Sequence, residues 1–177
     1  MNRIWKLSLI IVGIILLDQF TKGAVQSKFR LGETLPIIEG FFNFTYVRNP
    51  GAAWGVGATW GDSFRLILFK IVPVLACFWL MVLIWMERHK SLLLATAYSL
   101  ILAGAVGNLI DRISLNYVVD FLDFYMGQKH FPAFNVADSS ISIAAGLLII
   151  DFIRSFKKER QMPIEENSID NVENNEA

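Results

Sequence analysis

The chain has 177 residues, of which 54% are hydrophobic, and its 16 basic and 16 acidic residues give a formal net charge of zero. Its mean hydropathy is +0.47. A soluble domain carries roughly 45–50% apolar residues spread over amphipathic patterns, whereas here they are gathered into long blocks. The basic residues flank these blocks and form no patch, which argues against nucleic-acid binding. A chain of this length supports one domain.

Four apolar blocks predict transmembrane helices at about residues 4–25, 64–86, 92–111 and 137–156. A helix needs ~20 mostly apolar residues to cross a bilayer core. The middle two blocks reach that length unaided. The first reaches it if the helix continues through Asp18 and Lys22, and the last if the helix begins near Asn135. The sequence therefore predicts an α-helical membrane protein with a single domain over residues 1–160.

Basic residues predict the orientation of the four helices. They are Arg3 and Lys6 before the first helix, Arg88 and Lys90 between the second and third, and Lys157, Lys158 and Arg160 after the fourth. Cytoplasmic loops carry the excess of Lys and Arg, so both termini are expected in the cytoplasm. Residues 161–177 contain five acidic residues and no basic one, which predicts a disordered cytoplasmic tail.

The first outer segment, about residues 32–55, predicts a small β element on the membrane surface. Alternate side chains of a strand share a face, and here that face would carry Phe42, Phe44 and Tyr46. The run NPGAAWG follows, with small residues that allow close backbone approach. Its Trp54 suits the membrane interface.

Two polar groups occur at the predicted outer ends of the helices. Asn108, Asp111 and Arg112 are spaced i, i+3 and i+4, so they share a helix face. Arg112 alone could instead serve the last carbonyls of its helix. Asn135 and Asp138 open the fourth helix, where both residue types are also favoured as N-caps.

Asp120 and Asp138 lie beside strongly apolar stretches, where an ionised carboxylate is costly unless it is paired, solvated or in use. Two carboxyl groups held close together share a proton, so that one can act as a base and the other as an acid. This is the chemistry of peptide hydrolysis without a metal. Asp123 is the chief rival for Asp120, but the residues after it read as a loop. Asp18 and Lys22 fit an ordinary i, i+4 ion pair.

Other functions remain open at this point. A serine hydrolase using Ser139 would need His130 as its base and lacks a Gly-x-Ser-x-Gly turn. A small carrier or channel could use the same charges as an ion relay, although pore linings place polar groups through the whole bilayer depth. A third possibility is a protein that binds lipid-anchored peptides without cutting them.

Five segments carry a resemblance to a known family. They are residues 17–22 (LDQFTK), 49–55 (NPGAAWG), 104–112 (GAVGNLIDR), 118–121 (VVDF) and 131–139 (FPAFNVADS). In this order and spacing they resemble the bacterial lipoprotein signal peptidases, also called signal peptidase II. The resemblance covers nearly the whole body of the chain and leaves out the acidic tail.

The resemblance implies a monomeric aspartic protease of the bacterial inner membrane, with four helices, an extracytoplasmic β-cradle and a short periplasmic helix. Such enzymes cut prolipoproteins just before a diacylglyceryl-modified cysteine, near the outer face of the membrane. They need no metal or cofactor and are inhibited by globomycin. The catalytic residues would be Asp120 and Asp138. The residues that line or support the site would be Asn108, Asp111, Arg112 and Asn135, and those of the family's motifs near the substrate would be Asp18, Lys22, Asn49, Gly51 and Trp54.

Overall fold

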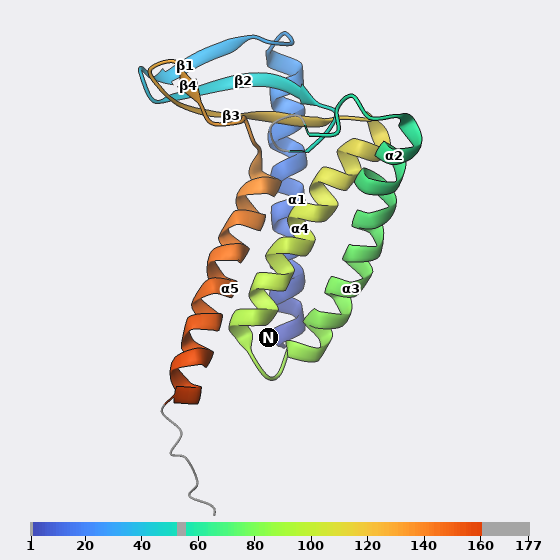
Figure 1. Cartoon of the computed structure of the whole chain (residues 1–177), viewed down its shortest axis with the longest axis vertical. Helices are drawn as coiled ribbons and strands as arrows, with labels where there is room; N and C mark the ends of the chain where they lie inside the picture. The colour runs from blue at the N-terminus through green and yellow to red at the C-terminus, as the bar shows by residue number, and fades with distance from the viewer. Residues whose placement is uncertain (1, 53–55, 161–177) are drawn as a thin grey trace, which may run out of the picture.

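The computed structural model describes residues 2–52 and 56–160 as a helical bundle with a small sheet across one end (Figure 1). Its helical elements are α1 (Arg3–Lys28), α2 (Asp62–Leu66), the π-helical segment η2 (Ile67–Ile71), α3 (Val72–Glu87), α4 (Leu92–Ser114) and α5 (Val136–Arg160). Its strands are β1 (Thr34–Ile38), β2 (Phe42–Asn49), β3 (Val118–Met126) and β4 (Lys129–His130).

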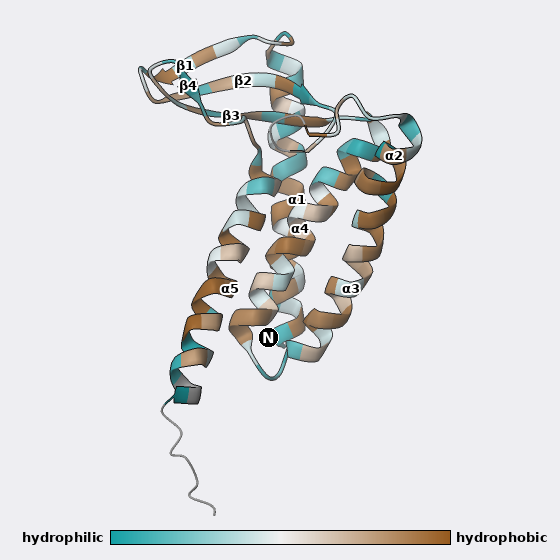
Figure 2. Ribbon diagram, in the orientation of Figure 1, coloured by the Kyte–Doolittle hydropathy of each residue, from teal (hydrophilic) through white to brown (hydrophobic). Residues whose placement is uncertain are grey.

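Four helices are long and apolar enough to cross a membrane, and α2, η2 and α3 together make the second of them. The predicted α-helical membrane class is therefore confirmed. Helix α4 is the most buried and contacts each of the others. Many large apolar residues of the four spans are exposed, as expected where the surrounding medium is lipid, and much of the helical ribbon is coloured as hydrophobic in Figure 2.

The end of the bundle opposite the sheet holds the N-terminus and the turn between α3 and α4 (Figure 1). Arg3 Nη1 donates to the carbonyl oxygens of Arg88 and His89 at 3.4 and 3.3 Å. The basic residues before the first span and after the second therefore gather at one end, as their spacing in the sequence predicts.

The sheet is antiparallel, with strand order β1-β2-β3-β4. The β element expected after the first helix is present as β1 and β2, whereas β3 and β4 are further strands that were not predicted from the sequence. A bulge in β2 lies between the pairs Phe44–Leu122 and Val47–Asp120. Regular alternation stops there, because adjacent Thr45 and Tyr46 are both buried.

The resemblance also implies a short periplasmic helix, and among the described residues each helical element belongs to one of the four spans. Residues 56–59 form turns, and residues 53–55, which include Trp54, lie outside the described residues. The acidic tail from residue 161 also lies outside them. The first helical residues after the turns, Asp62–Leu66, lead directly into the second span.

Glycines allow α4 to approach its neighbours closely. A Cβ built at Gly104 would lie 2.4 Å from the carbonyl oxygen of Ala137 and 2.7 Å from Ser140 Oγ. We therefore expect Gly104→Ala to lower the free energy of unfolding by about 1–3 kcal/mol, the usual cost of overpacking. The measurement is unfolding of the purified protein in detergent.

Gly146 in α5 provides the matched control, because nothing lies within 4 Å of a Cβ built there. Gly146→Ala should be neutral or slightly stabilising, since Ala is the better helix former. Equal stability of the two variants would contradict the close contact between α4 and α5.

Candidate active site

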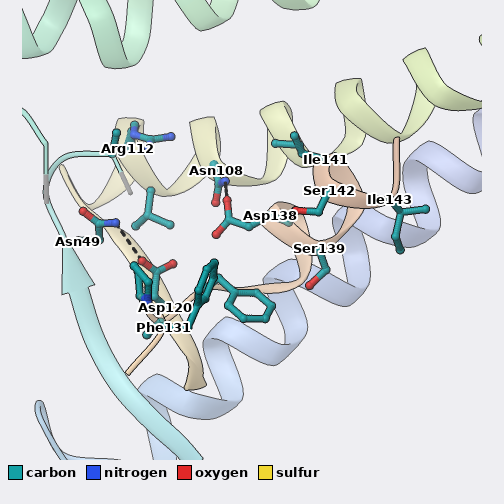
Figure 3. A pocket seen from close by; sticks show the side chains of 15 residues that line it. Asn49, Asn108, Arg112, Asp120, Phe131, Asp138, Ser139, Ile141, Ser142 and Ile143 are labelled. Carbon is teal, nitrogen blue, oxygen red and sulfur yellow. Dashed lines mark hydrogen bonds between the residues drawn. The ribbon is translucent and has the colours of Figure 1, made fainter. Parts of the chain in front are cut away.

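A cavity of about 530 Å³ opens where the sheet meets the end of the helical bundle. Asp120 reaches it from β3, and Asp138 reaches it from the first turn of α5 (Figure 3). Asn49, Asn108 and Arg112 also line it. Segments far apart in the chain therefore bring two carboxyl groups to one cavity.

Two asparagine side chains hold the Asp120 carboxyl group. Asn49 Nδ2 donates to Asp120 Oδ2 at 3.0 Å, and Asn135 Nδ2 donates to Asp120 Oδ1 at 2.7 Å. Asn49 Oδ1 accepts from the backbone N–H of Gly51 at 3.0 Å. This contact fixes which end of the Asn49 amide faces the carboxyl group.

Asp138 belongs to a reciprocal cap at the start of α5. Asn135 Oδ1 accepts from the Asp138 N–H at 2.9 Å, and Asp138 Oδ2 accepts from the Asn135 N–H at 3.3 Å. Such a capping box satisfies two backbone donors at a helix start. The remaining oxygen, Asp138 Oδ1, accepts from Asn108 Nδ2 at 2.8 Å. Asp138 therefore caps the helix and also faces the cavity.

A buried lysine fixes the orientation of the Asn108 side chain. Lys22 Nζ, which can only donate, lies 3.0 Å from Asn108 Oδ1. The amide must then present its N–H to Asp138. Asn135 Nδ2 also lies 3.2 Å from Asn108 Oδ1. Asn108 and Asn135 thus connect the two carboxyl groups through a single hydrogen-bonded network.

Lys22 lies between two carboxylates on different helices. Its Nζ is 2.8 Å from Asp18 Oδ2 and 3.1 Å from Asp111 Oδ2. All three residues are at most 2% exposed. Asp18 Oδ1 also accepts from the N–H of Ala137 at 2.9 Å. The predicted Asp18–Lys22 pair is therefore the buried support of the network, tying α1 to α4 and α5.

The environment of Asp120 raises its pKa from 3.8 to about 7. Burial is the largest cause, because a charged carboxylate loses its hydration, and the nearby Asp138 carboxyl adds to the rise. Hydrogen bonds from Asn49 and Asn135 and the charge of Lys22 oppose it. Near neutral pH, Asp120 is therefore able to hold a proton.

Arg112 does not join the polar cluster that its spacing with Asn108 and Asp111 predicts. Whereas Asn108 and Asp111 contact Lys22, Arg112 Nη2 donates to the carbonyl oxygen of Gly51 at 3.2 Å. A Cβ at Gly51 would lie 2.3 Å from the carbonyl oxygen of Val56, so the fold of this loop requires glycine there.

The expectation that Asp123 leads into a loop is wrong. Asp123 lies within β3 and is 7% exposed. Its carboxylate accepts from Asn43 Nδ2 at 2.8 Å and lies 2.8 Å from His130 Nδ1. Alternation along a strand places it on the face opposite Asp120, and it does not line the cavity. The aromatic and β-branched residues of this segment were the overlooked strand signal.

Several residues at the site were not singled out from the sequence. Phe131 and Phe134 line the cavity from the segment before α5, and Ser142 lines it one helical turn after Asp138. Gln19 Nε2 donates to Asp111 Oδ1 at 3.0 Å. The i, i+4 spacing of Asp138 and Ser142 was an available signal.

The fold and this site define a multi-pass membrane protein with two carboxyl groups on one cavity at one end of its bundle. The profile of the family described as Signal peptidase (SPase) II matches residues 10–154. A lipoprotein signal peptidase of Syntrophus aciditrophicus is 47% identical over 146 residues, covering 82% of this chain and 91% of that protein. One of Geobacter sulfurreducens is 42% identical over 150 residues, covering 85% and 92%.

A solved bacterial membrane enzyme shares the fold with a TM-score of 0.77 and 33% identity, over 93% of this chain and 97% of that one. The chain belongs to the signal peptidase II family, the lipoprotein signal peptidases. It is thus a membrane-embedded peptidase that processes the signal peptides of prolipoproteins.

Proposed function

We propose that this peptidase is of the aspartic type and cuts prolipoproteins immediately before the diacylglyceryl-modified cysteine. The observation that carries the proposal is the pair of carboxyl groups, Asp120 and Asp138, held on one cavity by a shared asparagine network. This arrangement can position one water and one peptide carbonyl between a base and an acid.

In this mechanism the ionised carboxylate takes a proton from water while the water oxygen attacks the scissile carbonyl carbon. The protonated carboxyl group donates its proton to the carbonyl oxygen, which gives a tetrahedral diol. Collapse of the diol breaks the C–N bond: the carboxyl group that took the water proton passes it to the leaving amine, and the other carboxylate takes back a proton from a diol hydroxyl. The dyad returns to its singly protonated state, so no metal and no covalent intermediate is needed.

Asp120 is assigned the proton and Asp138 the negative charge before the reaction. The raised pKa of Asp120 allows it to be protonated near neutral pH. Asp138 accepts from Asn108 Nδ2 and from the backbone N–H of Asn135, and it lies in the first turn of α5, where the helix dipole favours an anion.

The surrounding residues position this pair. Asn49, Asn108 and Asn135 orient the carboxyl groups through the hydrogen bonds described above. Asp18, Lys22 and Asp111 hold Asn108 in place from behind, and Arg112 anchors the loop at Gly51. Trp54, three residues after Gly51 in the sequence, is assigned to the substrate side on the family resemblance alone.

The site is placed at the outer face of the bacterial inner membrane, with both termini in the cytoplasm. The basic clusters at the opposite end of the bundle support this orientation. A lipidated substrate could then enter laterally from the bilayer to meet the cavity. The protein is expected to act as a monomer and to be inhibited by globomycin-type cyclic peptides.

The test is a cleavage assay on purified protein in detergent, with a diacylglyceryl-modified prolipoprotein and the same protein unmodified. The modified substrate should be cut just before its lipidated cysteine, as read from product masses, and the unmodified one should be cut poorly. EDTA should leave the rate unchanged. Binding without any cleavage would identify a binding protein instead, and loss of activity with EDTA would indicate a metal between the carboxyl groups.

The pH dependence of cleavage provides a further prediction. Deprotonation of Asp120 removes the proton that the dyad shares, so kcat/KM should fall as pH rises through about 7. Initial rates across pH 5–9, a range of about two units on either side of that pKa, measure this limb. An unchanged rate up to pH 9 would contradict the proton assignment.

The stability of the folded protein should also fall as pH rises toward the pKa of Asp120. The folded pKa of Asp120 is raised, so between 3.8 and about 7 the folded state binds a proton that the unfolded state has released. Stability due to this group is therefore full at low pH and declines as pH rises through that window. The decline should be absent in Asp120→Asn, as measured by unfolding in detergent at each pH.

A further inference from the structure

A second cavity lies outside the dyad, between the start of the second span and the end of α4. Its volume is about 570 Å³, and Arg65, Lys70, Arg112, Asn116 and Phe69 are among the residues that line it. The elements that carry its lining residues, α2 and the end of α4, lie at the same end of the bundle as the sheet (Figure 1). Neither Arg65 nor Lys70 contributes to the network that holds the two carboxyl groups.

The cavity carries an excess of positive charge. Three cationic side chains line it, Arg65, Lys70 and Arg112, and the only lining carboxylate among the described residues is Asp62. Asp62 is fully exposed and 3.8 Å from Arg65 Nη1, so it neutralises little of that charge. Lys70 and Arg112 form no ion pair with any described carboxylate.

Neutral oxygen atoms hold two of these cations in position. Lys70 Nζ donates to Asn116 Oδ1 at 2.8 Å, and Arg65 Nη2 donates to the carbonyl oxygens of Pro50 and Asn116 at 3.1 and 3.3 Å. Asn116 adopts φ 65°, a left-handed conformation that asparagine tolerates better than most residues. The side chains are thus preorganised without being neutralised.

Lys70 lies within the membrane-spanning segment. It follows Asp62 by eight residues, which places it ~12 Å along the helix, and it belongs to the π-helical segment η2. Short π-helical segments are frequent at functional sites. A lysine at that depth has its charge partly removed from water, so an anionic partner would stabilise it.

The surface beside the cavity is apolar. Leu66 and Phe69 of the same helical span line the cavity, and Leu66 is 49% exposed. Most of this span is coloured as hydrophobic in Figure 2. A ligand in the cavity would therefore have its anionic group among the three cations and any acyl chain against these side chains. A phospholipid has both parts, an anionic phosphate and apolar acyl chains.

We propose that the cavity binds the phosphate group of an anionic phospholipid from the surrounding bilayer. Arg65 and Lys70 would donate to the phosphate oxygens, and Arg112 would contribute its charge from the boundary with the dyad cavity. This binding is separate from peptide cleavage and requires no cleavage to be measured.

The test titrates full-length protein in a neutral detergent with dioctanoyl phosphatidylglycerol and counts bound lipid by native mass spectrometry. Wild type should bind it at one site, and Lys70→Gln should bind it at least about tenfold more weakly, which is the effect of losing one charge-assisted hydrogen bond. Lys70→Arg keeps the charge and should retain binding. Lys28→Gln, which removes an exposed lysine at the same end of the bundle, should also retain it.

Two further ligands identify the source of the phosphate. Dioctanoyl phosphatidylcholine has matched chains but no net charge and should bind more weakly. Inorganic phosphate lacks the chains and should also bind more weakly. Equal binding of either would overturn the assignment to an anionic lipid. Equal binding of phosphatidylglycerol by wild type and by a folded Lys70→Gln or Arg65→Gln variant would overturn the site itself, and unfolding in the same detergent establishes that each variant is folded.

Discussion

Asp138→Asn should reduce cleavage of a diacylglyceryl-modified prolipoprotein by about 10²–10⁴-fold, the range that a positioned acid or base contributes. The substitution keeps the shape of the side chain but removes the group that takes a proton from water. Asp120→Asn should have a loss of the same order, because it removes the shared proton. Single-turnover rates on purified protein measure both, since they report the chemical step.

Asp123→Asn is the matched control for Asp120→Asn, because both change a buried carboxyl group on β3. Asp123 contacts Asn43 and His130 and does not line the cavity. It should therefore retain most activity. Full cleavage by both Asp120→Asn and Asp138→Asn would refute the dyad, and an inactive Asp123→Asn beside an active Asp120→Asn would reassign the partner of Asp138.

Lys22→Met should lower the free energy of unfolding by about 3–5 kcal/mol, the usual consequence of removing one partner from a buried ion pair. It leaves Asp18 and Asp111, which are 0% and 2% exposed, without their shared cation. Met has a similar volume and adds no polar group, so lost charge compensation dominates the effect. Equilibrium unfolding in detergent measures it.

Lys28→Met serves as the control for Lys22→Met. It removes a lysine six residues further along the same helix, where the side chain is exposed. Surface substitutions of this kind change stability by about 0.5 kcal/mol or less. If both variants were equally stable, the buried cluster would not be holding α1 against α4.

The Lys22→Met variant also distinguishes support from catalysis. Without the ammonium donor, the longer 3.2 Å contact from Asn135 Nδ2 is left to hold the Asn108 oxygen away from Asp138, so the amide can turn over more readily. We therefore expect cleavage to fall even under conditions where the variant is folded, with a greater effect on kcat than on KM, because the reacting groups and not the substrate contacts are displaced.

The membrane-spanning helices could be predicted from the sequence because their signal is local. Continuous apolar blocks specify helices in lipid whatever the tertiary context, and the four spans follow from them. The strands β3 and β4 were not predicted, because a strand is stabilised by pairing with a segment that is distant in the sequence. The segment around Asp120 carries aromatic and β-branched residues that strands favour, and it forms a strand by pairing with β2, which is distant in the chain.

The roles of the individual carboxyl groups depended on information that spacing does not contain. From the sequence, Asp18, Asp111, Asp120, Asp123 and Asp138 are all acidic residues near the ends of apolar segments. In the structure, two of them surround Lys22, one contacts His130, and two face one cavity. The face of β3 on which each side chain lies, and the direction in which each side chain leaves α4, decide which of these carboxyl groups meet.

By itself, then, the sequence determined the membrane class, the four spans and the motifs of the family, because hydropathy and residue spacing are properties of neighbouring residues. Only the tertiary structure decided that Asn135 joins Asp120 to Asp138, that Lys22 sets the orientation of Asn108, and that Arg65 and Lys70 meet Arg112 in a second cavity. Each of these contacts joins different elements of the fold. They exist only once helix packing and strand register bring distant segments together.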